Sequence, residues 1–214
     1  MTPAQLQALL PQDLPAGLGW AVSGPVASPG RLFPEERALV ARAVPARRAE
    51  FIGGRLAARE AMARIGLPPA AVPPMPDRAP RWPDGVVGSI THTEGLCLAV
   101  VGRAAQWRAL GIDLEADTPL QTDLLPEIAD RDELATCDLP QELAGKRIFS
   151  AKEAAYKAQY PLTRTLFGFD AMRADLAGGE LRMVADIGLG RGARLPLTQW
   201  VVDGIILSLC ALPT

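Results

Sequence analysis

Histidine and cysteine are scarce in this chain. Its 214 residues include one histidine, His92, and three cysteines, Cys97, Cys137 and Cys210, at unrelated spacings. A structural zinc site needs clustered ligands, and a histidine-based triad needs partners placed around the ring, so both are disfavoured. The odd cysteine count and the apolar runs around Cys97 and Cys210 indicate reduced core thiols in a cytoplasmic protein, not a disulfide framework.

Three further features are absent. The chain has no apolar run long enough to span a bilayer and no basic segment followed by an apolar core at its start. Lysine and arginine total 22 against 24 acidic residues, so no overall basic field favours nucleic acid. A phosphate loop of the GxxxxGK[ST] type is also missing, which disfavours a P-loop kinase or ATPase. We therefore expect a soluble cytoplasmic monomer with no transmembrane segment and no nucleic-acid partner.

The composition is that of a globular protein, with 49% hydrophobic and 21% charged residues. A polar stretch at residues 103–108 separates two halves, which we assign as an N-terminal domain at 1–105 and a C-terminal domain at 106–214. The first 32 residues lack clear periodicity and predict a short strand or two with irregular cover. Each half is thus expected to hold a core of its own.

Each half carries one long helical pattern and antiparallel strand patterns. In the first half, a helix is predicted at 46–65 and a hairpin at 86–91 and 96–101, joined through residues 92–95. In the second half, a helix at 146–160 is expected to stop at Pro161. Strands are predicted at 171–176, 181–187, 199–202 and 205–211, with tight turns at Gly178-Gly179 and Asp203-Gly204. The predicted fold class is α+β, with two similar halves.

Three arginines share one side of the first long helix. Arg55 and Arg59 follow Arg48 by seven and eleven residues, which brings each of them within about 20° of Arg48 on a helical wheel. Apolar residues flank this seam. On an ordinary surface helix the arginines would face water, but their planar donors also suit a phosphate-rich ligand lying along the helix.

Two carboxylates project from one strand in the sequence Gly111-Ile112-Asp113-Leu114-Glu115. Because strands alternate faces, Asp113 and Glu115 share a side that Ile112 and Leu114 do not. Paired carboxylates repel unless a cation lies between them, and such hard oxygen ligands suit Mg²⁺. The pattern is weak by itself, since many exposed strands carry it.

A third carboxylate lies on the second long helix. Glu153 falls within the arc of Phe149, Tyr156 and Tyr160, so it interrupts an apolar face, and Lys157 follows one turn later. A carboxylate there is costly unless it is paired, hydrogen-bonded or bound to a metal. The alternative is an ordinary i,i+4 glutamate–lysine pair on a solvated helix.

Together these groups suggest a metal and phosphate site between the halves, suited to displacement at phosphorus. His92, at a strand end, is a further candidate for that site, although a lone histidine is more often a structural hydrogen-bonding group.

Four blocks of sequence occur in a specific order: residues 48–59 (RAEFIGGRLAAR), 82–92 (WPDGVVGSITH), 111–115 (GIDLE) and 149–157 (FSAKEAAYK). This series strongly resembles the 4′-phosphopantetheinyl transferases, and most closely their enterobactin-synthase-component type. Thr93 departs from the pattern, because relatives of this type often have cysteine after the histidine. The departure affects only local packing, since the matched carboxylates are intact.

The resemblance implies a pseudo-dimer of two α+β halves with the active site between them. The implied reaction uses coenzyme A and Mg²⁺, with Mn²⁺ as the alternative ion, to modify a serine of an apo acyl, aryl or peptidyl carrier protein, releasing adenosine 3′,5′-bisphosphate. The N-terminal half would bind the nucleotide and 3′-phosphate, and the C-terminal half the metal. The system served would make a siderophore, polyketide, nonribosomal peptide or fatty acid.

The resemblance also implies roles for matched residues. The metal ligands would be Asp113, Glu115 and Glu153; the catalytic residues would be Glu153, Lys157 and Lys152; coenzyme A would be held by Arg48, Arg55, Arg59, Arg78, Ser89, Thr91, His92 and Lys157. Two alternatives stay open. One is a non-catalytic coenzyme A-binding module of the same fold, and the other is a Mg²⁺-dependent phosphohydrolase.

Overall fold

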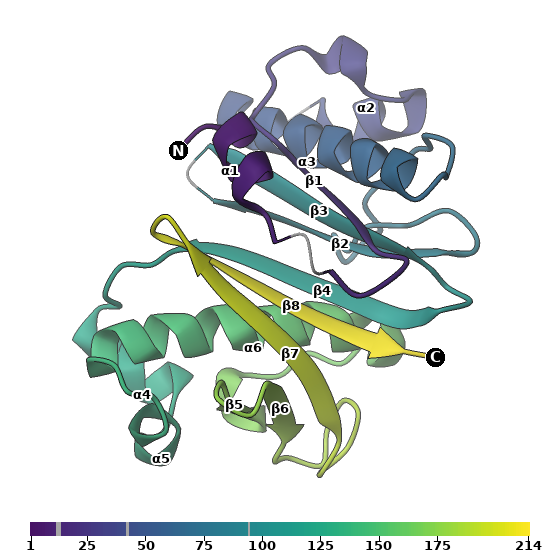
Figure 1. Ribbon diagram of the computed structural model, residues 1–214. Coiled ribbons are helices and arrows are strands. Elements are labelled where there is room, and N and C mark those ends of the chain that lie inside the picture. The colour runs from purple at the N-terminus through teal and green to yellow at the C-terminus, as the bar shows by residue number, and fades with distance from the viewer. Residues whose placement is uncertain (12–13, 42, 94) are drawn as a thin grey trace. The chain divides into compact units, whose positions relative to one another are not determined.

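The computed structural model describes residues 1–11, 14–41, 43–93 and 95–214. Within this part, the chain forms two units, one of Met1–Leu110 with Pro213–Thr214 and one of Gly111–Leu212 (Figure 1). The proposed division at 105/106 stays a prediction. Glu94, in the predicted hairpin turn, lies outside the described residues.

The N-terminal unit packs helices on a three-stranded antiparallel sheet of order β1-β3-β2. The helices are α1 (Pro3–Leu9), α2 (Pro34–Val40) and α3 (Pro45–Arg64), with a 3-10 turn η1 (Pro29–Arg31); the strands are β1 (Gly19–Ser23), β2 (Val86–Thr93) and β3 (Leu96–Arg103). The predicted helix at 46–65 and both hairpin strands are present. The structure adds α1, where only strand and irregular cover were expected.

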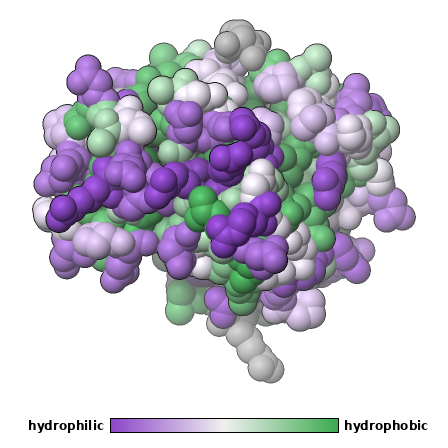
Figure 2. Space-filling view, turned by 90° about the horizontal axis from the view of Figure 1, so that it is seen from below, coloured by the Kyte–Doolittle hydropathy of each residue, from purple (hydrophilic) through white to green (hydrophobic). Residues whose placement is uncertain are grey.

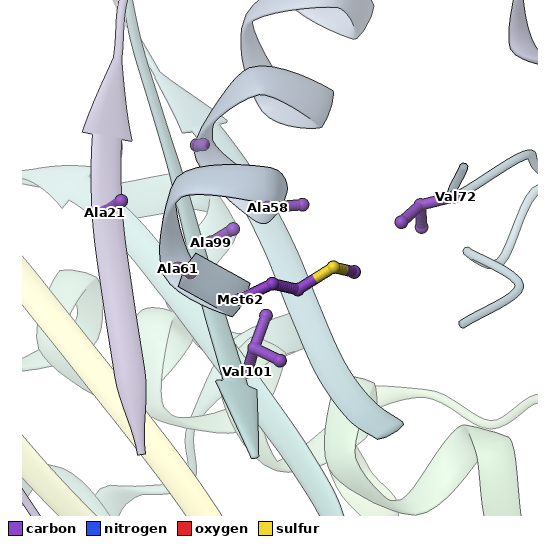
Figure 3. Close-up of a cluster of buried hydrophobic side chains, with 8 residues drawn as sticks. Ala21, Ala58, Ala61, Met62, Val72, Ala99 and Val101 are labelled. Atoms are coloured by element: carbon purple, nitrogen blue, oxygen red, sulfur yellow. The ribbon is translucent and has the colours of Figure 1, made fainter. Parts of the chain in front are cut away.

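Small side chains let α3 lie close to its sheet. Figure 3 shows Ala61 of α3 near Ala99, and Met62 next to Val101 and extended towards Val72. A Cβ at Gly19 of β1 would overlap the carbonyl oxygen of Ala61. The close approach therefore requires glycine at this position.

The C-terminal unit contains α6 (Gln141–Thr163) and a five-stranded sheet of order β4-β8-β7-β6-β5. The strands are β4 (Trp107–Ala116), whose first residues belong to the other unit, β5 (Met172–Asp175), β6 (Glu180–Met183), β7 (Arg194–Val202) and β8 (Ile205–Pro213); short helices are η2 (Thr122–Leu124), α4 (Leu125–Ile128), α5 (Arg131–Ala135) and η3 (Phe169–Ala171). Each unit thus has a long helix and an antiparallel sheet, which confirms the α+β prediction.

Gly111 brings α6 against β4. A Cβ at this position would overlap the carbonyl oxygen of Ala154, and the neighbouring Ala151, Ala155 and Ala158 are fully buried. A row of small residues on the helix and glycine on the strand thus allows close packing of the two backbones. This contact sets the distance between the strand that carries Asp113 and the helix that carries Glu153.

The predicted helix end at Pro161 was wrong by three residues. Proline removes one backbone donor but lies in the last turn, where the helix continues to Thr163. The chain leaves the helix at Arg164, whose φ of 54° is left-handed and whose N–H donates to the Tyr160 carbonyl oxygen.

The turns at the ends of the hairpins are as predicted. Asp203 and Gly204 both have positive φ, at 48° and 76°, as a tight two-residue hairpin requires, and Gly179 has φ 68°. The strands differ in length: β7 begins at Arg194 and not at 199, and β6 ends at Met183 and not at 187.

Two of the three cysteines are core thiols, as predicted. Cys97 and Cys210 are buried thiols, and burial raises their pKa to about 11 and about 12, while Cys137 is only half-buried.

The face shown in Figure 2 carries extended hydrophilic areas with smaller hydrophobic ones between them. Among the described helices, none has the length and apolar character needed to cross a membrane.

Candidate active site

The site begins with the two carboxylates of β4. The side chain of Asp113 is 4% exposed and that of Glu115 is 23% exposed. Leu114, which lies between them in the sequence, and Ile112, which precedes Asp113, are fully buried. The alternation of the strand therefore directs both carboxylates to one side, as predicted.

A row of charged side chains on α6 faces these carboxylates. Lys146, Glu153 and Lys157 are separated by seven and four residues, which places them on one stripe of the helix. The ammonium group of Lys157 contacts Asp113 Oδ1 at 2.6 Å, and that of Lys146 contacts Glu115 Oε2 at 2.5 Å. Each β4 carboxylate therefore holds one lysine of α6.

Glu153 lies between these two ion pairs in sequence and is half-buried. Its pKa is raised, first because burial disfavours the charged form; Lys157 opposes the shift, and Asp113 and Glu115 add to it. Asp113 and Glu115 thus lie close enough to Glu153 to affect its ionisation. Removing water and adding negative neighbours leaves Glu153 better suited than an exposed glutamate to hold a proton.

Aromatic side chains border Glu153. Phe149 and Phe169 have ring centroids 5.5 Å apart, and Tyr156 meets Phe167 edge-on at 5.5 Å. A pocket of about 100 Å³ lies among Glu153, Tyr156, Phe167 and Phe169. Lys152 and Met172 also line this pocket.

The donor set fits a hard divalent cation. Three carboxylates from a strand and a helix provide the oxygen ligands that Mg²⁺ prefers. In the described part of the chain, however, no three acidic, histidine or cysteine side chains have the spacing of a ready metal site. In this arrangement each β4 carboxylate pairs with an ammonium group of α6.

Lys152 lies away from this stripe. Its side chain is 1% exposed, and its ammonium group pairs with Glu133 Oε1 at 2.9 Å. It also donates to the carbonyl oxygens of Ile128 and Phe169 at 2.8 and 3.1 Å. Lys152, predicted as a catalytic residue, is thus engaged in contacts inside the C-terminal unit.

In the N-terminal unit, His92 belongs to a charged cluster with Arg47 and Glu50. Arg47 Nη1 lies 2.7 Å from His92 Nε2, and Glu50 Oε2 lies 3.7 Å from His92 Nδ1 and 3.5 Å from Arg47 Nη1. All three side chains are at least one-third exposed. The cluster presents two cationic or donor groups to a ligand from solvent.

The arginine seam divides into different environments. Arg55 is 7% exposed; it donates from Nε to the Val72 carbonyl oxygen at 2.8 Å and stacks 3.8 Å from the Phe51 ring centroid. Burial lowers its pKa to about 10, a shift that Glu36 opposes. Arg59 pairs with the fully buried Glu36 at 3.0 Å. Arg59 therefore joins α3 to α2, a structural role that the wheel did not reveal.

The other predicted nucleotide contacts lie around the same unit. Arg48 is half-buried on α3, and Arg78 is exposed in a turn at φ 70°. Ser89 and Thr91 are buried on one face of β2, whereas His92 is exposed on the opposite face. The strand therefore does not present these three side chains to one side.

Two charged residues of these clusters, Lys146 and Arg47, were not predicted from the sequence as site residues. Lys146 precedes Glu153 by two helical turns, so the wheel that grouped Glu153 with Lys157 could have found it. Arg47 is adjacent to the predicted Arg48 in the sequence. Its distinguishing feature is its contact with His92 on β2, which the helical wheel alone does not give.

Family models match both units. A model of the 4′-phosphopantetheinyl transferase N-terminal domain matches residues 35–102, and a model of the 4′-phosphopantetheinyl transferase superfamily matches residues 109–203.

Individual relatives agree. The chain is 39% identical over 193 residues to the 4′-phosphopantetheinyl transferase PptT of Mycobacterium tuberculosis, covering 82% of this chain and 84% of the relative. It is 47% identical over 151 residues to Svp of Streptomyces mobaraensis, covering 68% and 61%. It is 41% identical over 133 residues to enterobactin synthase component D of Salmonella typhi, covering 59% and 54%.

The two α+β units each match one family model of the 4′-phosphopantetheinyl transferases. The chain belongs to the 4′-phosphopantetheinyl transferase superfamily and is an enzyme of that type. The predicted likeness to the enterobactin-synthase-component type is also confirmed.

Proposed function

We propose that this enzyme transfers the 4′-phosphopantetheine group of coenzyme A to a serine hydroxyl of an apo carrier protein and releases adenosine 3′,5′-bisphosphate. The observation that carries the proposal is the arrangement of Asp113, Glu115, Glu153 and Lys157 on facing elements of one unit. Such a set can hold a metal and a diphosphate together.

The metal we propose is Mg²⁺, with Mn²⁺ as the alternative. Asp113, Glu115 and Glu153 would hold it, and a bound divalent ion would neutralise charge on the phosphate oxygens. Lys157 leaves Asp113 to bind the diphosphate as a point charge. Arg48, Arg78 and His92, together with Arg47, hold the nucleotide and its 3′-phosphate.

Glu153 accepts the proton of the attacking serine, directly or through one water molecule. Its raised pKa supports this role, because a base works best when its pKa approaches the working pH. The adjoining aromatic pocket limits water around the reacting groups. Relatives named enterobactin synthase component D favour a siderophore carrier as the first substrate to test, and the reduced thiols favour a cytoplasmic reaction.

The test is incubation of the protein with coenzyme A, Mg²⁺ and a panel of apo carriers, followed by intact mass. We expect one phosphopantetheine increment on at least one carrier. Asp113→Ala should reduce transfer by at least a hundredfold, because its carboxylate would hold the metal and it contacts Lys157. Coenzyme A binding without any increment would instead support a non-catalytic module, and its cleavage without an acceptor would support a phosphohydrolase.

A further inference from the structure

Lys146 is the least expected charge near the carboxylates. Its side chain is 15% exposed, and its ammonium group lies 2.5 Å from Glu115 Oε2 and 5.3 Å from the Phe149 ring centroid. The carboxylate on one side and the aromatic face on the other both favour a cation at this place. Lys146 is therefore held against Glu115, not extended into solvent.

The two lysines of α6 are related in position. Lys157 contacts Asp113, and Lys146 contacts Glu115, so each β4 carboxylate already has a positive partner. Glu153 lies on the same helical stripe between them. A divalent cation entering this group meets two ammonium charges within a few ångströms, and like charges at such distances repel strongly when they are partly buried.

We infer that Lys146 is a positioning residue that holds Glu115 and opposes binding of the divalent cation by itself. This inference rests on the proposed function. A diphosphate supplies negative charge that offsets the repulsion between the ammonium groups and the metal. Lys146 thereby couples metal binding to coenzyme A binding, and the coupling acts equally on both ligands.

The chain supplies a matched control. Arg147 joins α6 to the residue after β4 by contacts of 2.8 and 3.1 Å to the two carboxylate oxygens of Asp117. Its side chain is 24% exposed, and that of Asp117 is 14% exposed. Arg147→Met therefore removes an ion pair of similar burial between the same elements but leaves the three proposed ligands untouched.

The experiment measures free Mn²⁺ by electron paramagnetic resonance during titration of the whole protein, with and without coenzyme A and without a carrier. Lys146→Met should bind Mn²⁺ alone on the order of fivefold more tightly than the parent protein, the scale of one partly screened charge interaction. Saturating coenzyme A should reduce this difference in Mn²⁺ affinity between Lys146→Met and the parent protein. Lys146→Arg, which keeps the charge, and Arg147→Met should bind Mn²⁺ as the parent does.

The outcomes separate this inference from the proposed function. If the parent protein and Asp113→Ala bind Mn²⁺ equally, the metal site itself is wrong. If the parent binds Mn²⁺ through Asp113 but Lys146→Met binds it no more tightly, only the role of Lys146 is overturned. Unfolding of Lys146→Met when Arg147→Met stays folded also overturns it, because the lysine would then serve stability.

Discussion

Lys152 and Glu153 are neighbours in sequence with opposite surroundings. The ammonium group of Lys152 donates to Glu133 and to two backbone carbonyl oxygens, which matches its three N–H donors. Burial lowers its pKa, while Glu133 opposes that shift. The contacts join α6 to η3 and to the segment containing α4 and α5. Lys152 thus acts on the site by fixing the helix that carries Glu153.

Lys152→Met is therefore expected to lower the free energy of unfolding by about 3–5 kcal/mol, because Glu133 would remain buried without its cation. Urea unfolding followed by circular dichroism measures the loss. Stability equal to that of the parent protein would contradict the structural role.

A double substitution separates stability from chemistry. Lys152→Met with Glu133→Leu removes both charges, so it should recover part of the lost stability. If the folded double variant also retains transfer activity within about tenfold, Lys152 does not contact the reacting groups. A folded double variant with no activity would restore the predicted catalytic role.

The residue roles show what the sequence could and could not specify. The carboxylates Asp113, Glu115 and Glu153 were found from strand alternation and helical spacing, which depend only on local geometry. The partners of Lys152 and Arg59 were not, because Glu133 and Glu36 come from distant segments. A wheel gives the direction of a side chain but not the element that it meets.

At the scale of single elements, α5 depends on its N-cap. Asp130 accepts from the N–H of Glu133 at 2.8 Å, while the Glu133 carboxylate accepts from the N–H of Asp130 at 3.1 Å. This reciprocal capping box begins a helix of five residues that also supplies the partner of Lys152. The cap therefore supports the position of Glu133.

Asp130→Ala should lower the free energy of unfolding by about 1 kcal/mol at pH 7, as loss of an N-cap does. The pKa of Asp130 is lowered from 3.8, first by the Glu133 N–H and also by Arg173. Because the folded state favours the ionised form, this stabilisation is present above pH 3.8 and is lost as the pH falls through the lower, folded value. Thermal unfolding of both proteins from pH 7 to pH 3 measures it.

Asp130→Asn is the control, since it keeps the oxygen acceptor and removes the charge. At pH 7 it should lower the free energy of unfolding less than Asp130→Ala does. If Asp130→Ala lowers the free energy of unfolding by the same amount at every pH down to 3, the charge of Asp130 does not contribute to stability.

The elements themselves were largely predictable. The helices α3 and α6 and the turns at Gly179 and Asp203-Gly204 follow from periodicity and turn chemistry. Helix α1 was missed because its surroundings are rich in proline and alanine, although Thr2 and Gln5 form its capping box. Pro161 does not end the helix, because in the last turn its missing donor removes one hydrogen bond and few residues follow it.

At the scale of the whole molecule, the proposed ligand groups are divided between the units. Arg47, Arg48 and His92 belong to Met1–Leu110, whereas Asp113, Glu115 and Glu153 belong to Gly111–Leu212. The net charge of −2 gives no overall attraction for an anionic substrate. Local clusters in each unit must therefore supply the affinity, and each ligand should stabilise the unit that binds it.

This division predicts a pattern of amide hydrogen exchange. Saturating Mn²⁺ alone should slow exchange in β4 and α6 but leave β2 and the start of α3 unchanged, because its proposed ligands all lie in the C-terminal unit. Coenzyme A with Mn²⁺ should slow exchange in both units, and a ligand at about 100 times its Kd stabilises by about 2.7 kcal/mol. Mass spectrometry of peptic peptides gives the measurement, with Asp113→Ala as the metal control. Protection of the C-terminal unit alone by coenzyme A would place the nucleotide away from His92 and refute the proposed roles of the arginines.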